Sequence, residues 1–186
     1  VLATIGSCTL IKKKLDHSGI DDIAETMLND FKIEDSNSLS DYIGNFRLMD
    51  RGTVEIPNDI KTEQLNTWLL NGNIIHEKIT FPSKLKKNNG QNDTAVFYLY
   101  RKGDLNNQKV ILWIPGFGVS DFAFHFIKRF FKNEIEAGYA VLFYNIPYHL
   151  ERIEPHREMG DGFVTSSIIN NLEVIKHSLA EIETAI

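Results

Sequence analysis

The sequence contains a single cysteine, Cys8, among its 186 residues. One cysteine excludes an internal disulfide framework and fits a reducing compartment. The sequence also lacks a run of about 18 apolar residues, so it holds no complete transmembrane helix. Its 20 Lys and Arg residues do not gather into the basic face that nucleic-acid binding needs, and this partner is therefore set aside. What remains is the composition of an ordinary globular protein.

The negative charge lies in the first part of the chain. Residues 1–72 carry 7 Lys and Arg against 12 Asp and Glu, which accounts for the whole formal charge of -5, while residues 73–186 carry 13 of each. Apolar residues at helical spacing recur within the same part, at 20–31, 39–46 and 65–69. Asn71 and Gly72 then form a helix-stop signal. We therefore predict an acidic, mostly helical lead segment over residues 1–72 and a separate core domain over 73–186.

The chain opens with the residues Val-Leu-Ala-Thr-Ile-Gly-Ser-Cys and turns polar at Lys12. A short apolar stretch that ends in small residues before a cysteine is typical of a bacterial lipoprotein signal. On this interpretation residues 1–8 are a signal remnant, Cys8 is a lipidation candidate, and the lipid is the only membrane anchor. The alternative is a buried thiol in a short strand or helix. The first interpretation implies the bacterial cell envelope, and the second is compatible with the cytoplasm.

Strand-like runs replace the helical pattern after residue 73. Residues 74–81 and 94–100 flank a polar loop, which predicts a β-hairpin. Two further apolar runs, 109–114 and 139–146, lie on either side of a helical pattern that begins at Ser120 or Asp121. A strand, a helix and a strand in this order build a parallel sheet. We therefore predict an α/β fold with a central strand at 109–114.

Two helices are predicted in the core domain. The first should be largely covered, because its apolar side chains form two adjoining stripes, Phe122, Phe126 and Phe130 beside Ile127, Phe131 and Ile135. The second has the longest apolar stripe of the chain, Val164, Ile168, Leu172, Ile175, Leu179, Ile182 and Ile186. This stripe has no stop signal, so we expect the natural chain to continue. A half sheet would leave a strand edge unpaired and the face of the last helix bare, which should cause aggregation or dependence on a partner.

The loop Pro115-Gly116-Phe117-Gly118 stands between a strand and a helix, where glycine-rich loops bind ligands. A dinucleotide fingerprint requires a third glycine where Asp121 stands, and a phosphate loop requires a lysine that is missing before Lys128. Neither nucleotide-binding motif is present. We predict no cofactor and no metal, since His149 and His156 lack a supporting carboxylate pattern.

This loop and the segment Asn145-Ile-Pro-Tyr-His-Leu-Glu-Arg152, together with Gly160-Asp-Gly-Phe163, resemble the α/β-hydrolase superfamily. Within it the resemblance is to the branch related to α/β-hydrolase domain-containing protein eighteen, and it covers residues 74–186. It implies the amino-terminal half of a hydrolase sheet, with two antiparallel strands followed by strand, helix, strand and helix. It also implies that the backbone N–H of Phe117, or of Gly118, stabilises the oxyanion of a reacting ester, lipid or peptide.

The sequence departs from the family because it has no G-x-S-x-G motif; Ser120 stands at a helix cap instead. In the family's chain order the Ser-Asp-His triad follows the last helix present here, so the chain alone should be inactive and would need a carboxy-terminal half. The alternative is a degenerate, non-catalytic fragment that serves as a binding or structural module, tethered to a membrane through Cys8.

Tyr148, His149 and Arg152 are candidates to line a substrate pocket, because the carboxyl ends of parallel strands bind ligands. The competing interpretation is a loop that these three side chains anchor by hydrogen bonds. His125 is assigned to the surface or packing of a helix. No cluster of functional side chains is predicted around the remaining histidines, His17, His76 and His177.

Overall fold

A computed structural model describes residues 57–65, 74–83, 90–116, 121–165 and 167–186. The chain divides into two compact units, and most described residues belong to the unit that contains 47–163 and 173–186. The other unit includes residues 164–172, where Ser167 caps the start of a helix by accepting a hydrogen bond from Asn170 N at 3.1 Å. Cys8 and the predicted helices at 20–31 and 39–46 lie outside the described residues.

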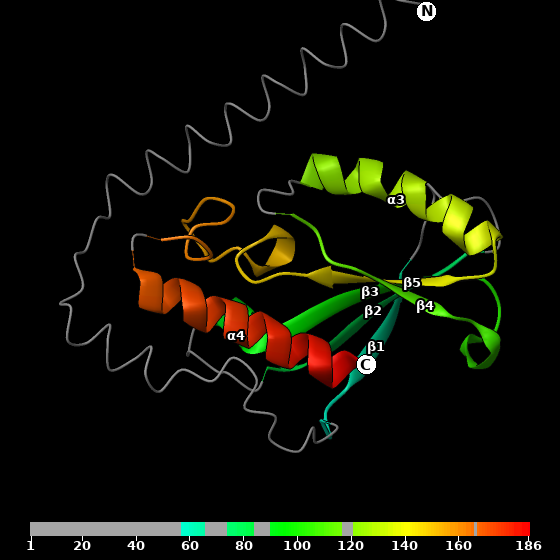
Figure 1. Ribbon diagram of the computed structural model, residues 1–186, viewed down its shortest axis with the longest axis horizontal. Coiled ribbons are helices and arrows are strands. Elements are labelled where there is room, and N and C mark those ends of the chain that lie inside the picture. The colour runs from blue at the N-terminus through cyan, green and yellow to red at the C-terminus, as the bar shows by residue number, and fades with distance from the viewer. Residues whose placement is uncertain (1–56, 66–73, 84–89, 117–120, 166) are drawn as a thin grey trace, which may run out of the picture. The chain divides into compact units, whose positions relative to one another are not determined.

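A mixed five-stranded sheet forms the centre of the larger unit (Figure 1). Its strands, in spatial order, are β1 (Lys61–Leu65), β2 (Ile75–Pro82), β3 (Thr94–Arg101), β5 (Ala140–Asn145) and β4 (Val110–Trp113). The first three neighbouring pairs are antiparallel, and β4 and β5 are parallel. The last strand in the chain is thus inserted between the two that precede it. The predicted α/β fold class and the hairpin of β2 and β3 are confirmed.

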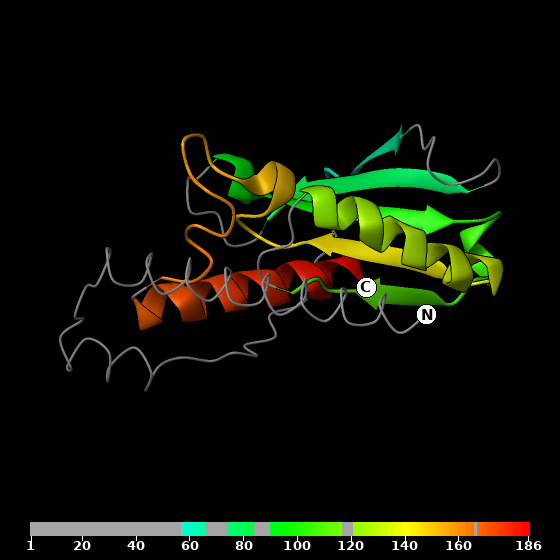
Figure 2. The same cartoon turned by 90° about the horizontal axis from the view of Figure 1, so that it is seen from above.

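The two faces of the sheet carry different clusters because alternate residues of a strand point to opposite sides. Helix α3 (Asp121–Glu136) covers one face, where Phe131 and Ile135 pack with Val141 and Phe143 of β5 (Figure 2). On the other face, Ile182 and Ala185 of helix α4 (Ile168–Ala185) pack against a cluster made by Phe81, Ala95, Phe97, Leu99, Ala140, Leu142, Tyr144 and Ile146. Strand β5 is therefore covered on both faces, and all six of its residues are buried.

Three predictions about these elements are wrong. Strand β1 lies in the predicted helical lead segment and pairs with β2, so the sheet begins before residue 73 and Leu65 is a strand residue. Strand β4 is not central: β3 is the middle strand, β5 lies between β3 and β4, and β4 ends the sheet among the described residues. Phe130 is 62% exposed, because α3 buries the neighbouring line of Phe124, Phe131 and Ile135 instead.

The apolar stripe of helix α4 is not its most buried face, although Ile182 of the stripe packs against the sheet. Ile168 and Ile175 of that stripe are exposed, whereas the buried residues of the helix are Val174, His177 and Glu181. The reason is electrostatic, since Glu181 forms an ion pair with a fully buried arginine. A buried charge without a partner is very costly, so the ion pair decides which face of the helix is covered.

Candidate functional site

The candidate site is the edge of the sheet where β4 and β5 end. The two strands are parallel, with Trp113 in register with Phe143, so the loops that follow them leave from the same edge. The β4 loop begins at Ile114 and Pro115, and a Cβ added at Gly116 would meet no atom within 4 Å. Phe117 and Gly118, the predicted oxyanion donors, lie outside the described residues. The described part of this edge is therefore mostly the segment after β5.

The segment after β5 has an unusual backbone. Tyr148 and Leu150 have φ values of 62° and 49°, a region that costs non-glycine residues energy. The segment then folds back on itself: Gly160 N donates to the carbonyl of Tyr148 at 2.8 Å. Gly162, with φ of 94°, lies so close that an added Cβ would stand 2.7 Å from the Tyr148 ring. Such strain persists only where surrounding contacts impose it, and it is frequent at functional sites.

His149 lies between these two strained residues and is 1% exposed. Its Nδ1 is 2.9 Å from the carbonyl oxygen of Pro147, which can only accept, so Nδ1 carries the proton. Burial lowers the pKa of His149, and the nearby charge of Arg152 lowers it further. The ring is therefore neutral at pH 7 with its acceptor at Nε2. It meets Phe163 edge-on, with ring centroids 5.5 Å apart.

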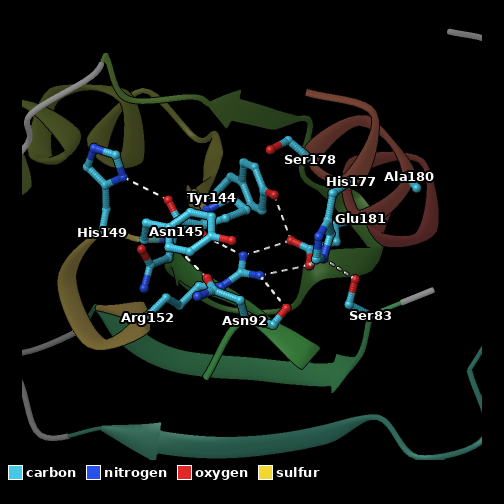
Figure 3. Close-up of polar contacts among 12 residues, drawn as sticks. Ser83, Asn92, Tyr144, Asn145, His149, Arg152, His177, Ser178, Ala180 and Glu181 are labelled. Carbon is cyan, nitrogen blue, oxygen red and sulfur yellow. Dashed lines mark hydrogen bonds and ion pairs between the residues drawn. The ribbon is translucent and has the colours of Figure 1, made fainter. Parts of the chain in front are cut away.

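Arg152 joins three parts of the fold (Figure 3). Its Nη1 and Nη2 bind the two carboxylate oxygens of Glu181 on α4 at 2.7 and 2.8 Å. The same nitrogens also donate to the carbonyl of Asn145 at 2.9 Å and to that of Asn92, before β3, at 3.1 Å. The Asn92 side chain in turn accepts from Tyr148 N at 3.0 Å. These contacts hold the segment after β5 against the sheet and α4.

Glu181 stays ionised in this setting. Burial alone would raise its pKa, but hydrogen bonds from His177 and the charge of Arg152 outweigh it and bring the pKa to about 2. Tyr144 adds a third donor, with its hydroxyl 2.6 Å from Glu181 Oε2. Burial, together with the Glu181 charge, raises the pKa of Tyr144. Burial by itself would lower the pKa of Arg152, but the charge and the hydrogen bonds of the Glu181 carboxylate oppose this effect, and the pKa is raised overall.

Ser83, His177 and Glu181 have the residue types of a catalytic triad but not its geometry. Ser83 Oγ lies 2.5 Å from His177 Nε2, and Glu181 Oε1 lies 2.8 Å from the same nitrogen. In a triad the acid and the serine contact opposite nitrogens of the imidazole. Here the ionised Glu181 requires a proton on Nε2, so this nitrogen cannot take one from Ser83. Since all three side chains are also buried, this cluster is structural.

The three pocket candidates from the sequence are brought together, but as buried side chains. Tyr148, His149 and Arg152 are 6%, 1% and 0% exposed. The hydrogen bonds of His149 and Arg152 agree with the interpretation that the segment anchors itself, and a role in a substrate pocket stays a prediction.

Sequence reasoning missed the partners of Arg152. No functional cluster was predicted around His177, and its structural contacts with Ser83 and Glu181 were not foreseen. One local signal existed, because His177 and Glu181 are four residues apart on a helix and so share a face. Of the other histidines, His76 is buried and stacks on Tyr100 with centroids 4.3 Å apart. The side chain of His125 lies outside the described residues.

Comparison with known proteins adds no identification. No protein-family model matches the chain, and no curated protein matches it. Within the described ranges, no group of three or more His, Cys, Asp and Glu side chains could hold a metal ion. None of the helices in those ranges is long and apolar enough to span a membrane.

Proposed function

We propose that the chain is the amino-terminal half of an α/β-hydrolase of the serine hydrolase type, acting on a carboxylic ester, a lipid or a peptide. It contributes the loop after β4 to the oxyanion site. It lacks the nucleophile, acid and base, and by itself it is inactive.

The observation that carries this proposal is the order of the strands. An α/β-hydrolase sheet opens with two antiparallel strands, after which the fourth strand lies between the second and the third. Strands β2, β3, β5 and β4 follow the same order, with β1 added outside them. The parallel pair then brings the Pro115-Gly116 loop and the strained segment after β5 to one edge of the sheet, where such sheets bind ligands.

The chemistry that this edge would supply is the binding of negative charge. When a nucleophile attacks an acyl carbon, the carbonyl oxygen becomes an oxyanion, and main-chain N–H groups stabilise it. Glycine permits this because the backbone can approach the reacting atoms without a side chain. The open space around Gly116 agrees with such an approach. The neutral His149 ring would help to shape the wall of the site behind that loop.

The gene sequence beyond Ile186 tests the proposal first. A strand followed by G-x-S-x-G within about 20 residues supports it, whereas a stop codon there overturns it. The extended protein should then be labelled by a fluorophosphonate probe, while residues 1–186 alone should not. Gly116→Ala should lower its kcat/KM roughly tenfold or more with an unchanged melting temperature, because the added methyl group meets a ligand but no protein atom.

One observation favours a second function. The candidates Tyr148, His149 and Arg152 are buried in contacts with the protein itself, as expected of a degenerate fragment retained as a binding or structural module. In that case the gene ends near Ile186, and Cys8 tethers the module to a membrane. Mass spectrometry of the natively expressed protein tests the tether. A lipid on Cys8 supports it, and an unmodified amino terminus upstream of Cys8 removes it.

A further inference from the structure

The described residues around the Arg152 guanidinium include four buried polar atoms that no hydrogen bond satisfies. Asn92, Asn145 and Arg152 are each at most 1% exposed. Within the described part of the chain, Asn92 Nδ2, Arg152 Nε and both polar atoms of the Asn145 side chain have no hydrogen-bond partner. Buried polar atoms are nearly always hydrogen-bonded, because an unpaired one loses its bond to water and gains nothing in return. Four such atoms on three residues therefore require a partner.

The four atoms belong to residues that contact one another (Figure 3). Asn145 and Asn92 both accept a hydrogen bond from Arg152, through their main-chain carbonyl oxygens, at 2.9 and 3.1 Å. A guanidinium has five N–H groups. The four on Nη1 and Nη2 of Arg152 are used, two by these carbonyl oxygens and two by the carboxylate of Glu181. The Nε–H is the one that remains without a partner among the described residues.

Turning the asparagine amides does not supply the missing hydrogen bonds. A half-turn of an amide exchanges the places of its oxygen and its nitrogen. In Asn145 neither atom has a partner among the described residues, so the exchange satisfies neither. In Asn92 the oxygen accepts from Tyr148 N at 3.0 Å, and the exchange would bring two donors together. The other orientation of each amide therefore leaves the same need.

We propose that this cluster is an internal hydration site, in which an ordered water molecule binds the Asn145 amide and bridges it to Arg152 Nε or Asn92 Nδ2. Water both donates and accepts, as three nitrogen donors and one oxygen acceptor require, and a buried water typically makes about three hydrogen bonds. An ion fits less well. Arg152 and Glu181 already balance each other's charge, so an added ion would be buried without a counter-charge.

Two measurements on the unchanged protein test this site, which does not depend on hydrolase chemistry. A high-resolution crystal structure should show a water within hydrogen-bonding distance of the Asn145 amide and of Arg152 Nε or Asn92 Nδ2. In solution, NMR should show nuclear Overhauser effects from a long-lived water to the side-chain N–H groups of Asn145. A cluster without water overturns the proposal, as does a direct hydrogen bond from the Asn145 amide to another protein group.

The variant Asn145→Leu tests the same site by its effect on stability. Leucine has the same branching but no polar atom, so it should stabilise the protein if the amide is unpaired and destabilise it if the amide binds water. We expect the folding equilibrium constant, measured by urea unfolding, to fall roughly tenfold. Asn133→Leu, the same change at an exposed residue of α3, should alter it less than about twofold. An Asn145→Leu variant at least as stable as the unchanged protein overturns the proposal, and if this variant does not fold, the two measurements on the unchanged protein decide.

Discussion

Arg152 is the residue on which the candidate site depends. It is fully buried, and its guanidinium satisfies a carboxylate of α4 and carbonyl groups that precede β3 and end β5. A bidentate pair of this kind fixes orientation as well as distance. Asn92 and Asn145 accept through main-chain carbonyls, so the position of Arg152 depends on the path of the backbone there. Arg152 therefore holds the segment that carries His149 against the sheet and α4.

Replacing Arg152 by methionine should strongly destabilise the protein. The variant Arg152→Met leaves Glu181 charged and buried without its cation, which costs about 3–5 kcal/mol. Urea unfolding measures this loss. Arg157→Met is the matched control, because its ion pair with Glu154 is at the surface, where its side chain is 51% exposed, and should contribute less than about 1 kcal/mol.

A double variant separates charge burial from packing. Arg152→Met with Glu181→Leu removes both charges and should recover much of the stability lost in the single variant. If the double variant is as unstable as the sum of both single variants, the two charges do not interact and the account of Arg152 is wrong.

At the scale of elements, α4 shows how one ion pair overrides a hydrophobic pattern. Its stripe of Ile and Leu is the most regular in the sequence, yet Val174, His177 and Glu181 form the buried face. Strand β5 shows a simpler case, because the apolar run at 139–146 was predicted to be a strand and all six residues of β5 are buried. The apolar pattern thus identified both elements, but it did not identify the buried face of α4, where a charged side chain is buried.

Neighbouring residues of α4 provide a direct test of this orientation. Val174 is 1% exposed and Ile175 is 43% exposed. Val174→Ala should cost about 2 kcal/mol because it leaves a cavity, whereas Ile175→Ala should cost less than about 0.5 kcal/mol. Chemical denaturation measures both values. The reverse order would mean that the apolar stripe, and not the face with Val174, packs against the sheet.

At the scale of the whole molecule, the buried ion pair should make stability depend on pH. The pKa of Glu181 is about 2 in the folded protein and 4.5 as its ordinary value. The folded state therefore binds the proton less readily than the unfolded state. The stabilisation is complete above about pH 4.5 and is lost as the pH falls towards 2, by a few kcal/mol.

Urea midpoints measured at a series of pH values test this dependence. Between pH 4.5 and 2, the unfolding free energy should change less steeply with pH in Glu181→Gln, because this variant has no carboxyl group at position 181 to titrate. An unchanged slope in that variant would assign the acid sensitivity to other carboxylates.

The sequence by itself determined the elements that depend on local pattern. The apolar runs gave the hairpin of β2 and β3 and the strand β5, and the loop at Pro115 and Gly116 separated a strand from a helix. These predictions succeeded because strand and helix periods, together with Pro and Gly, act over a few residues. The segment from Asn145 to Arg152 was singled out by a family resemblance, and its role stays a prediction.

Tertiary structure alone decided which strand is central, which face of α4 is covered, and what the candidate site residues contact. Strand order depends on pairings between distant residues, such as β3 with β5, that no local pattern encodes. The partners of Arg152 are residues 92, 145 and 181. A buried guanidinium requires an opposite charge and hydrogen-bond acceptors around it, and only the folded chain brings these groups together. Likewise, only the folded sheet places the charged strand β1 and the uncharged strand β4 at opposite ends of the described strands.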